Sequence, residues 1–112
     1  QSQLLLQSAK RVGQILAQAN LASGSVQPEL FQEQAEKHLW VAMQDLGAKL
    51  QYDLSFKNYA QAFSHLLALS HPLAGFFEHV FVMADDMAIR QNRLNLLSQL
   101  QAHLQSIVSL SR

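Results

Sequence analysis

The sequence predicts an all-α protein, a bundle of four to five helices joined by short connections. Apolar residues recur every three or four positions through nearly the whole chain, which is the spacing of one helix face. Only 4 Gly and 2 Pro interrupt the 112 residues. No stretch shows the apolar–polar alternation of a strand bounded by turns. Residues 1–112 are therefore expected to form a single domain.

The first predicted helix carries one apolar stripe and ends near Asn20. Its stripe consists of residues three or four apart, namely Leu5, Ala9, Val12, Leu16 and Ala19. A loop is expected at residues 23–25, where the sequence reads SGS. Pro28 then suits the first position of a helical turn, with Glu29 near the positive end of its dipole.

Two further helices and a short apolar segment are expected in the middle of the chain. A long helix is predicted over about residues 31–52. Ser55 is expected to cap the next helix, because a serine hydroxyl accepts hydrogen bonds from backbone N–H groups of a first turn. Pro72 is predicted to open the apolar segment, which runs to residue 82.

The last predicted helix begins at Asp85 and Asp86 and runs to about Leu110. At about 100° per residue, its apolar side chains share one sector. These are Ile89, Leu96, Leu97, Leu100, Leu104, Ile107 and Val108. Arg93 projects near the centre of this sector and Arg90 near its edge.

A guanidinium on an apolar face requires a partner, because an unpaired buried charge is costly. The sequence therefore predicts a structural, buried ion pair between Arg93 and Glu78, with Asp85 or Asp86 as alternative partners. Arg90, nearer to solvent, can instead pair with Asp86 four residues earlier.

Composition gives no sign of a strongly basic nucleic-acid binder. Lys and Arg total 8, Asp and Glu total 8, and the net charge is zero. A nonspecific binder would be basic, because its affinity comes from neutralising phosphates. A neutral domain can still read a few bases if other parts of a larger protein hold the RNA. There is no signal peptide and no apolar run of about 18 residues, so we expect a domain of a longer, non-membrane protein.

Catalytic and metal-binding patterns are missing from the sequence. Cysteine is absent, and there is no glycine-rich phosphate loop and no His-Glu-x-x-His motif. The five histidines have no pair at i, i+4 spacing: His38, His65, His71, His79 and His103. No catalytic residue, no metal ligand and no cofactor of this domain's own is predicted.

Residues 76–97, FFEHVFVMADDMAIRQNRLNLL, resemble the signature of DALR-type anticodon-binding domains. That signature is a Phe-Phe pair, an apolar Val-Met-Val-Met-like run, a short acidic cluster and Arg-x-Asn-Arg-Leu-x-Leu-Leu. The four letters that name the family match in part. Met87 and Ile89 replace Asp and Leu, whereas Ala88 and Arg90 fit.

DALR-type domains occur in arginyl-tRNA synthetases and at the C-terminus of the bacterial glycyl-tRNA synthetase beta subunit. Residues 10–16, KRVGQIL, are similar to the Lys-Arg-Val-x-Asn-Ile-Leu segment of the glycyl beta subunit, with Gln14 in place of Asn. The Gly-Leu-x-Leu-Leu-Gly-like tail usual in arginyl enzymes is missing. The resemblance therefore favours the glycyl beta subunit.

This resemblance implies a non-catalytic module that recognises the anticodon arm of glycine tRNA. The implied partners are the remainder of the beta subunit and a catalytic alpha subunit, in a cytoplasmic heterotetramer whose alpha subunit uses ATP and Mg²⁺. Two alternatives stay open. One is the equivalent domain of an arginyl enzyme, and the other is a helical assembly module without direct RNA contact.

Lys10, Arg11 and Arg90 are the predicted RNA contacts, since adjacent cations outside the apolar stripe can bind phosphate. The three phenylalanines of residues 76–81 could stack on unpaired bases. Their apolar neighbours instead favour burial, so Phe76, Phe77 and Phe81 are left out of the predicted site.

Overall fold

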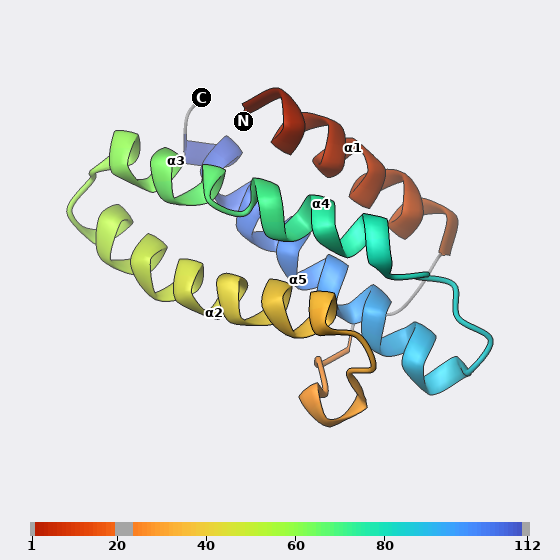
Figure 1. Cartoon of the computed structure of the whole chain (residues 1–112). Helices are drawn as coiled ribbons and strands as arrows, with labels where there is room; N and C mark the ends of the chain where they lie inside the picture. Colours follow the sequence, from red (N-terminus) through yellow and green to blue (C-terminus); the bar gives the residue numbers. More distant parts are fainter. Residues whose placement is uncertain (1, 20–23, 111–112) are drawn as a thin grey trace.

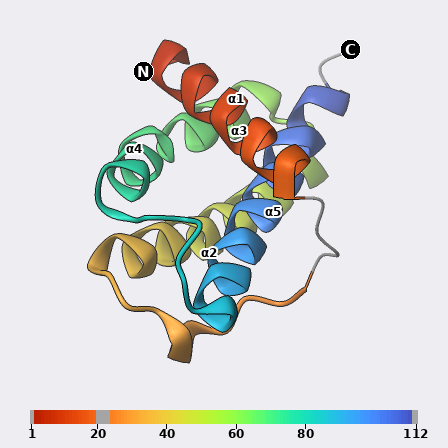
Figure 2. The same cartoon turned by 90° about the vertical axis from the view of Figure 1, so that its right-hand side faces the viewer.

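The last helix, α5 (Met87–Leu110), contacts α1, α2, α3 and η1. The computed structural model describes residues 2–19 and 24–110. Within these it contains α1 (Ser2–Ala19), η1, a 3-10 turn (Pro28–Leu30), α2 (Gln34–Ser55), α3 (Tyr59–Leu67), α4 (Ser70–His79) and α5. Helices α1 and α2 lie on opposite sides of α4 and α5 (Figures 1 and 2). The predicted all-α bundle is confirmed.

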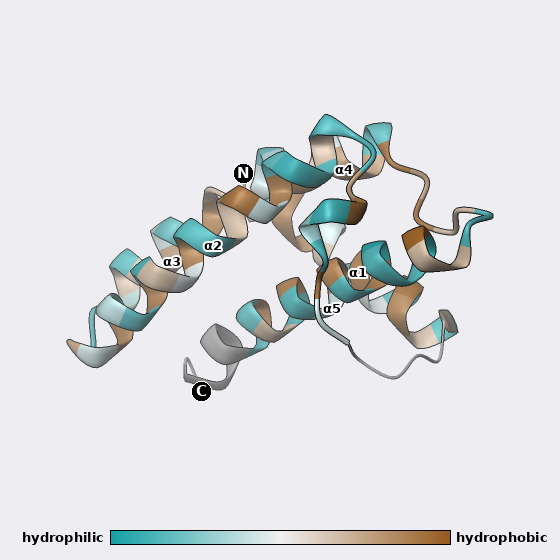
Figure 3. Ribbon diagram, turned by 90° about the horizontal axis from the view of Figure 1, so that it is seen from below, coloured by the Kyte–Doolittle hydropathy of each residue, from teal (hydrophilic) through white to brown (hydrophobic). Residues whose placement is uncertain are grey.

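Each helix buries one side, as the apolar spacing predicted. Hydrophobic and hydrophilic residues alternate along the ribbon of the helices (Figure 3). Leu5 and Val12 of the first stripe are buried, and residues from four other segments complete the core. Its apolar side chains with zero exposure are Val12, Leu39, Met43, Leu73, Phe76, Leu96, Leu97 and Leu100. The predicted helix end at Asn20, Ser23 of the predicted loop, and the side chains of Ile107 and Val108 lie outside the described residues.

The turn between α2 and α3 differs from its prediction. Ser55 does not cap α3. It is the last residue of α2, and its hydroxyl donates to the backbone oxygen of Tyr52 at 2.8 Å. The cap is Asn58, whose side-chain oxygen accepts from the backbone N–H of Gln61 at 3.3 Å. Lys57, just before the cap, has a φ of 56°, so the chain reverses through a left-handed residue after α2 has continued beyond Ser55.

Helix α4 is shorter than the predicted apolar segment. It ends at His79, and Val80 is extended. Because an extended chain points successive side chains to opposite sides, Val80 and Val82 are buried whereas Phe81 is 71% exposed. The prediction that Phe81 is buried is therefore wrong, and the prediction for Phe76 is confirmed by its zero exposure.

The start of α5 agrees with the sequence. The carboxylate of Asp86 accepts hydrogen bonds from the backbone N–H groups of Ala88 and Ile89, at 2.9 and 3.1 Å. An aspartate at this position satisfies two N–H groups that have no partner inside the helix. Asp86 thus caps the helix.

Arg93 is buried and ion-paired, but its partner is Glu36 rather than Glu78. Nη2 of Arg93 lies 3.1 Å from Oε1 of Glu36, and the two residues are 6% and 0% exposed. Glu78 is exposed near the end of α4, and Asp85 and Asp86 are exposed before α5, so the predicted partners are wrong. Glu36, 57 positions away in sequence, is brought to Arg93 because α2 packs against α5.

The same carboxylate and guanidinium hold two loops. Oε1 of Glu36 also accepts the backbone N–H groups of Gln32 and Glu33, both at 2.9 Å. Nη1 of Arg93 donates to the backbone oxygen of Phe81 at 2.7 Å. The ion pair therefore fixes the start of α2 and the connection between α4 and α5 relative to each other.

Two asparagines of α5 fix the segment that leads into η1. The side chain of Asn92 accepts from the backbone N–H of Gln27 at 2.7 Å and donates to its oxygen at 2.9 Å. Asn95 donates to the backbone oxygen of Ser25 at 3.2 Å. We call Glu36, Asn92, Arg93 and Asn95 the polar clamp. All four are buried, and most of their polar atoms have hydrogen-bond partners, whereas Oε2 of Glu36 and Nε of Arg93 have none among the described residues.

Replacing Arg93 with Ala should lower the free energy of unfolding by about 3–5 kcal/mol, because Glu36 would be left charged and buried. Urea denaturation of the 112-residue chain measures this change. The control is Glu78→Ala, which removes an exposed carboxylate and should change stability by no more than about 0.5 kcal/mol. Equal unfolding midpoints for Arg93→Ala and the parent chain would contradict the assignment.

Burial lowers the pKa of His103, since desolvation disfavours the charged imidazolium. At pH values between this lowered pKa and the ordinary value of about 6.5, His103 is protonated in more of the unfolded chains than of the folded ones. The contribution of His103 to the free energy of unfolding is thus complete at pH values above its ordinary pKa. That contribution is lost as the pH falls through the lowered pKa of the folded state. His103→Gln should reduce the loss of unfolding free energy between about pH 7.5 and 5.5. Identical losses in both proteins would show that His103 does not carry this dependence.

Candidate nucleic-acid interface

The structure does not bring the three predicted RNA contacts into one patch. Lys10 and Arg11 are exposed in the middle of α1, and Arg90 is half-buried near the start of α5. A Cβ atom on Gly13 would lie 3.8 Å from the side-chain nitrogen of Gln101, so this part of α1 lies beside residue 101 of α5. Arg90 precedes Gln101 by eleven residues, or about 16 Å along the helix.

Arg90 also lies in an acidic part of the molecule. Asp85 and Asp86 precede it and are exposed. Asp86 uses its carboxylate to cap α5, and the predicted pairing with Arg90 is not among the ion pairs of the described residues. Of the three predicted contacts, Lys10 and Arg11 are therefore in the better position to bind phosphate.

A first cleft lies between α1 and α4, beside this pair of cations. It has a volume of about 290 Å³ and is lined by Gln7, Ser8, Arg11, Ala74, Phe77 and Glu78. The guanidinium carbon of Arg11 lies 4.6 Å from the centroid of the Phe77 ring, which is cation–π geometry. The ring is positioned in turn by an edge-to-face contact with buried Phe76, with centroids 5.6 Å apart and planes at 74°.

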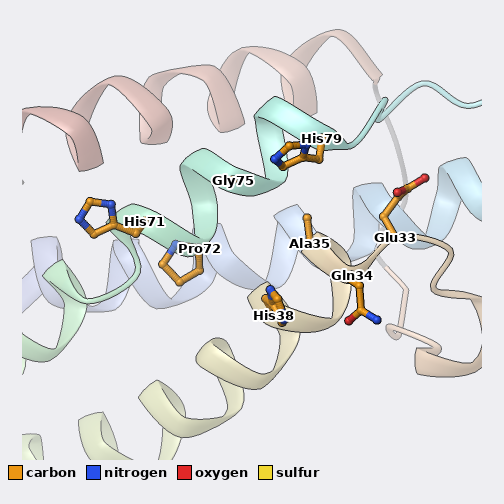
Figure 4. A pocket seen from close by; sticks show the side chains of 8 residues that line it. All are labelled: Glu33, Gln34, Ala35, His38, His71, Pro72, Gly75 and His79. Atoms are coloured by element: carbon orange, nitrogen blue, oxygen red, sulfur yellow. The ribbon is translucent and has the colours of Figure 1, made fainter.

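A second cleft lies on the other side of α4, between it and the start of α2 (Figure 4). It has a volume of about 460 Å³. Its lining comprises Glu33, Gln34, Ala35, His38, His71, Pro72, Gly75 and His79. We call it the histidine cleft. The half-buried lining residues Ala35, Pro72 and Gly75 are small or apolar, whereas the exposed ones are polar. The cleft therefore combines a small apolar surface with five polar side chains, which can orient a ligand through hydrogen bonds.

Gly75 has no evident structural reason to be glycine. It lies inside α4, and a Cβ atom there would meet no heavy atom within 4 Å. Glycine inside a helix costs about 0.5–1 kcal/mol relative to alanine. Because Gly75 lines the histidine cleft, the missing side chain leaves that part of the cleft open.

Helix α4 separates the two clefts on one face of the molecule. Figure 1 shows α4 between α1 and α2, and each cleft lies along one of its sides. A helix with side chains is about 10–12 Å across, so a single ligand of modest size can reach both clefts.

Sequence reasoning missed both clefts, although one signal was available. Lys10 and Arg11 were identified, but the ring beside Arg11 was assigned to the core. His71, Gly75 and His79 recur every four residues and so share one side of α4. In the prediction from sequence, the histidines enter only as possible metal ligands. Within the described residues, no three His, Asp or Glu side chains are grouped to hold a metal ion.

The family of the chain follows from comparison with known proteins. Residues 5–110 match the DALR anticodon binding domain. The chain therefore belongs to the DALR anticodon-binding domain family, as the motif of residues 76–97 predicted. None of the described helices is both long and apolar enough to cross a membrane.

Its similar relatives include glycine–tRNA ligase beta subunits. One from Neisseria gonorrhoeae is 36% identical over 102 residues, which cover 91% of this chain and 81% of that protein. One from Delftia acidovorans is 39% identical over 104 residues, covering 92% of this chain. One from Hahella chejuensis is 39% identical over 102 residues, covering 89% of this chain. The chain spans about 15% of the length of the Delftia and Hahella proteins.

Arg11→Ala should lower the free energy of unfolding by no more than about 1 kcal/mol, because an exposed cation–π contact contributes about 0.5–1 kcal/mol. Urea denaturation of the 112-residue chain gives this value. Phe77→Leu removes the aromatic partner of the same cation–π contact. A loss above about 2 kcal/mol would mean that Arg11 is needed for folding and is not available for a ligand.

Proposed function

We propose that this domain binds the anticodon arm of glycine tRNA as part of a glycine–tRNA ligase beta subunit. Membership of the DALR anticodon-binding domain family carries the proposal. The similarity to glycine–tRNA ligase beta subunits over about nine-tenths of the chain supports the glycine enzyme over the arginyl alternative. The domain contributes binding, and the reaction of glycine, ATP and tRNA takes place in the catalytic alpha subunit, which supplies the ATP and Mg²⁺ sites.

The face formed by α1 and α4 is the proposed RNA contact. Lys10 and Arg11 are exposed there, and Arg11 lies over a half-buried aromatic ring. Cations bind the phosphates, which position the RNA, while aromatic and polar side chains bind unpaired bases. A zero net charge fits a domain that contacts few phosphates, with the remainder of the beta subunit holding the rest of the tRNA.

A separate surface fits contact with the rest of the enzyme. Phe81, Met83 and Met87 are 71%, 45% and 71% exposed in the segment that leads into α5. Asp85 and Asp86 lie among them, so the surface is apolar and acidic, and phosphate would be repelled from it. We therefore propose that this end packs against the remainder of the beta subunit or the alpha subunit of a heterotetramer in the cytoplasm. The assembly alternative thus applies to one end of the domain.

Deletion of the domain tests the function directly. The complete ligase and a ligase without these 112 residues should be compared on glycine tRNA with its own and with altered anticodon bases. We expect the deletion to remove most of the dependence of aminoacylation on the anticodon. If the shortened enzyme discriminates among anticodons as well as the complete one, the function belongs elsewhere.

Lys10→Ala and Arg11→Ala in the complete ligase should weaken tRNA binding. Each lost phosphate contact should reduce the slope of log affinity against log salt concentration by about 0.7–0.9. Filter binding at several salt concentrations measures the slope. Lys57→Ala, in the turn between α2 and α3, removes a charge away from both clefts and serves as the matched control. Arg90→Ala is expected to resemble the control, and an unchanged slope in both α1 variants would reject this face.

A further inference from the structure

We propose that the histidine cleft between α2 and α4 receives one unpaired base of the RNA whose phosphates bind Lys10 and Arg11. The inference rests on the proposed function and goes beyond it, because it assigns a base-binding pocket on the other side of α4. Its residues are those shown in Figure 4, and no metal ion or catalytic step is involved.

Gly75 is the first observation that points to a ligand. The fold has room for a side chain there, since an added Cβ would meet no heavy atom within 4 Å apart from the neighbouring backbone of its own helix. Gly75 nevertheless lies inside the helix, on the side that faces the cleft. Apart from proline, glycine has the lowest helix propensity of all residues. Glycine at such a position allows a ligand to approach the helix backbone closely. The ligand is therefore flat or narrow at this point.

The polar lining suits the edges and faces of a nucleobase. Imidazole rings, here His38, His71 and His79, are among the side chains on which unpaired bases stack. The carboxylate of Glu33 also accepts the backbone N–H of Glu36 in the capping box of α2, and its remaining lone pairs can accept from exocyclic amino groups. Gln34 supplies both a donor and an acceptor. The carboxylate of Glu33 disfavours a bare anion in the same place. A base with an exocyclic amino group (adenine, cytosine or guanine) is therefore the preferred occupant.

The polar clamp holds one rim of this cleft rigid. The backbone N–H of Glu33 donates to Oε1 of Glu36 at 2.9 Å, and that oxygen is also paired with Arg93. Glu33, the N-cap of α2, thus has a fixed backbone position. A pocket whose walls are ordered before binding loses less entropy when the ligand enters. This gives the buried ion pair a consequence for recognition as well as for folding.

The position of the cleft fits a looped RNA. Helix α4 alone separates it from the cleft that contains Arg11 and Phe77. An RNA loop that crosses α4 can place its backbone at α1 and turn one base into the histidine cleft, a distance of about one helix diameter. Sequence-specific recognition uses loops whose bases are splayed in this way.

Gly75→Gln tests the proposal, because its side chain would enter the cleft. In the complete ligase we expect tRNA affinity to fall about tenfold or more, the effect of losing one stacked base. The smaller change Gly75→Ala should also weaken binding, while the unfolding midpoint of the 112-residue chain stays equal or rises. Ala60→Gln on the exposed surface of α3 is the matched control, and it should bind tRNA normally.

Glu33→Gln tests the preferred base. With the parent enzyme, anticodon variants that replace an amino-bearing base by uridine should bind more weakly. In the Glu33→Gln ligase, the difference in affinity between the amino-bearing base and uridine should be smaller at one position of the anticodon only. Preferences that are unchanged at every position would overturn the assignment of Glu33.

An NMR measurement on the unsubstituted chain tests the proposal without any enzyme variant. In histidine-labelled 112-residue chain titrated with an anticodon stem–loop of glycine tRNA, the ring signals of His38 and His79 should shift. Shifts confined to residues near α1, with both rings unaffected, would overturn the proposal. Normal tRNA affinity of the Gly75→Gln ligase would also overturn the base-binding proposal. If deletion of the domain nevertheless removes the anticodon dependence, the proposed function stands. If deletion leaves anticodon dependence intact, the proposed function itself fails.

Discussion

The ion pair between Arg93 and Glu36 is the constraint on which the rest of the structure depends. Two charges with 6% and 0% exposure can persist in the interior only if both are paired and hydrogen-bonded. Here the additional bonds go to the backbone of two loops, at Phe81 and at residues 32–33. One charged pair thereby connects α5, the start of α2 and the chain that leaves α4.

Most of the motif of residues 76–97 has a structural role, and it contributes little to the candidate binding face. Asn92 and Arg93, two of its polar positions, are buried and bind backbone groups of distant segments. Val80 and Val82 are buried, and they position the exposed Phe81 between them. The motif specifies the geometry of one end of the bundle. The candidate binding residues lie on α1, α2 and α4, largely outside the motif.

The distribution of charge reconciles a neutral domain with RNA binding. Five exposed carboxylates lie before α2, near the end of α4 and before α5: Glu29, Glu33, Glu78, Asp85 and Asp86. They offset cations placed elsewhere, including Lys10 and Arg11 on α1. Net charge therefore says little about this protein, because long-range attraction depends on where the charges are. Asp85 and Asp86 would turn phosphates away from the start of α5, while Lys10 and Arg11 on α1 would attract them.

The sequence by itself determined the helical class, most helix positions, the cap at Asp86 and the need of Arg93 for a buried partner. Each of these follows from spacing within about two turns or from the energetic cost of one residue, and so can be read locally. Only the tertiary structure decided that the partner is Glu36, that Phe81 faces solvent, and that Arg90 is separated from Lys10 and Arg11. It also made the two clefts, because their walls come from helices up to about 70 positions apart in sequence. Which distant residues meet depends on how the helices pack, and helical periodicity carries no information about that.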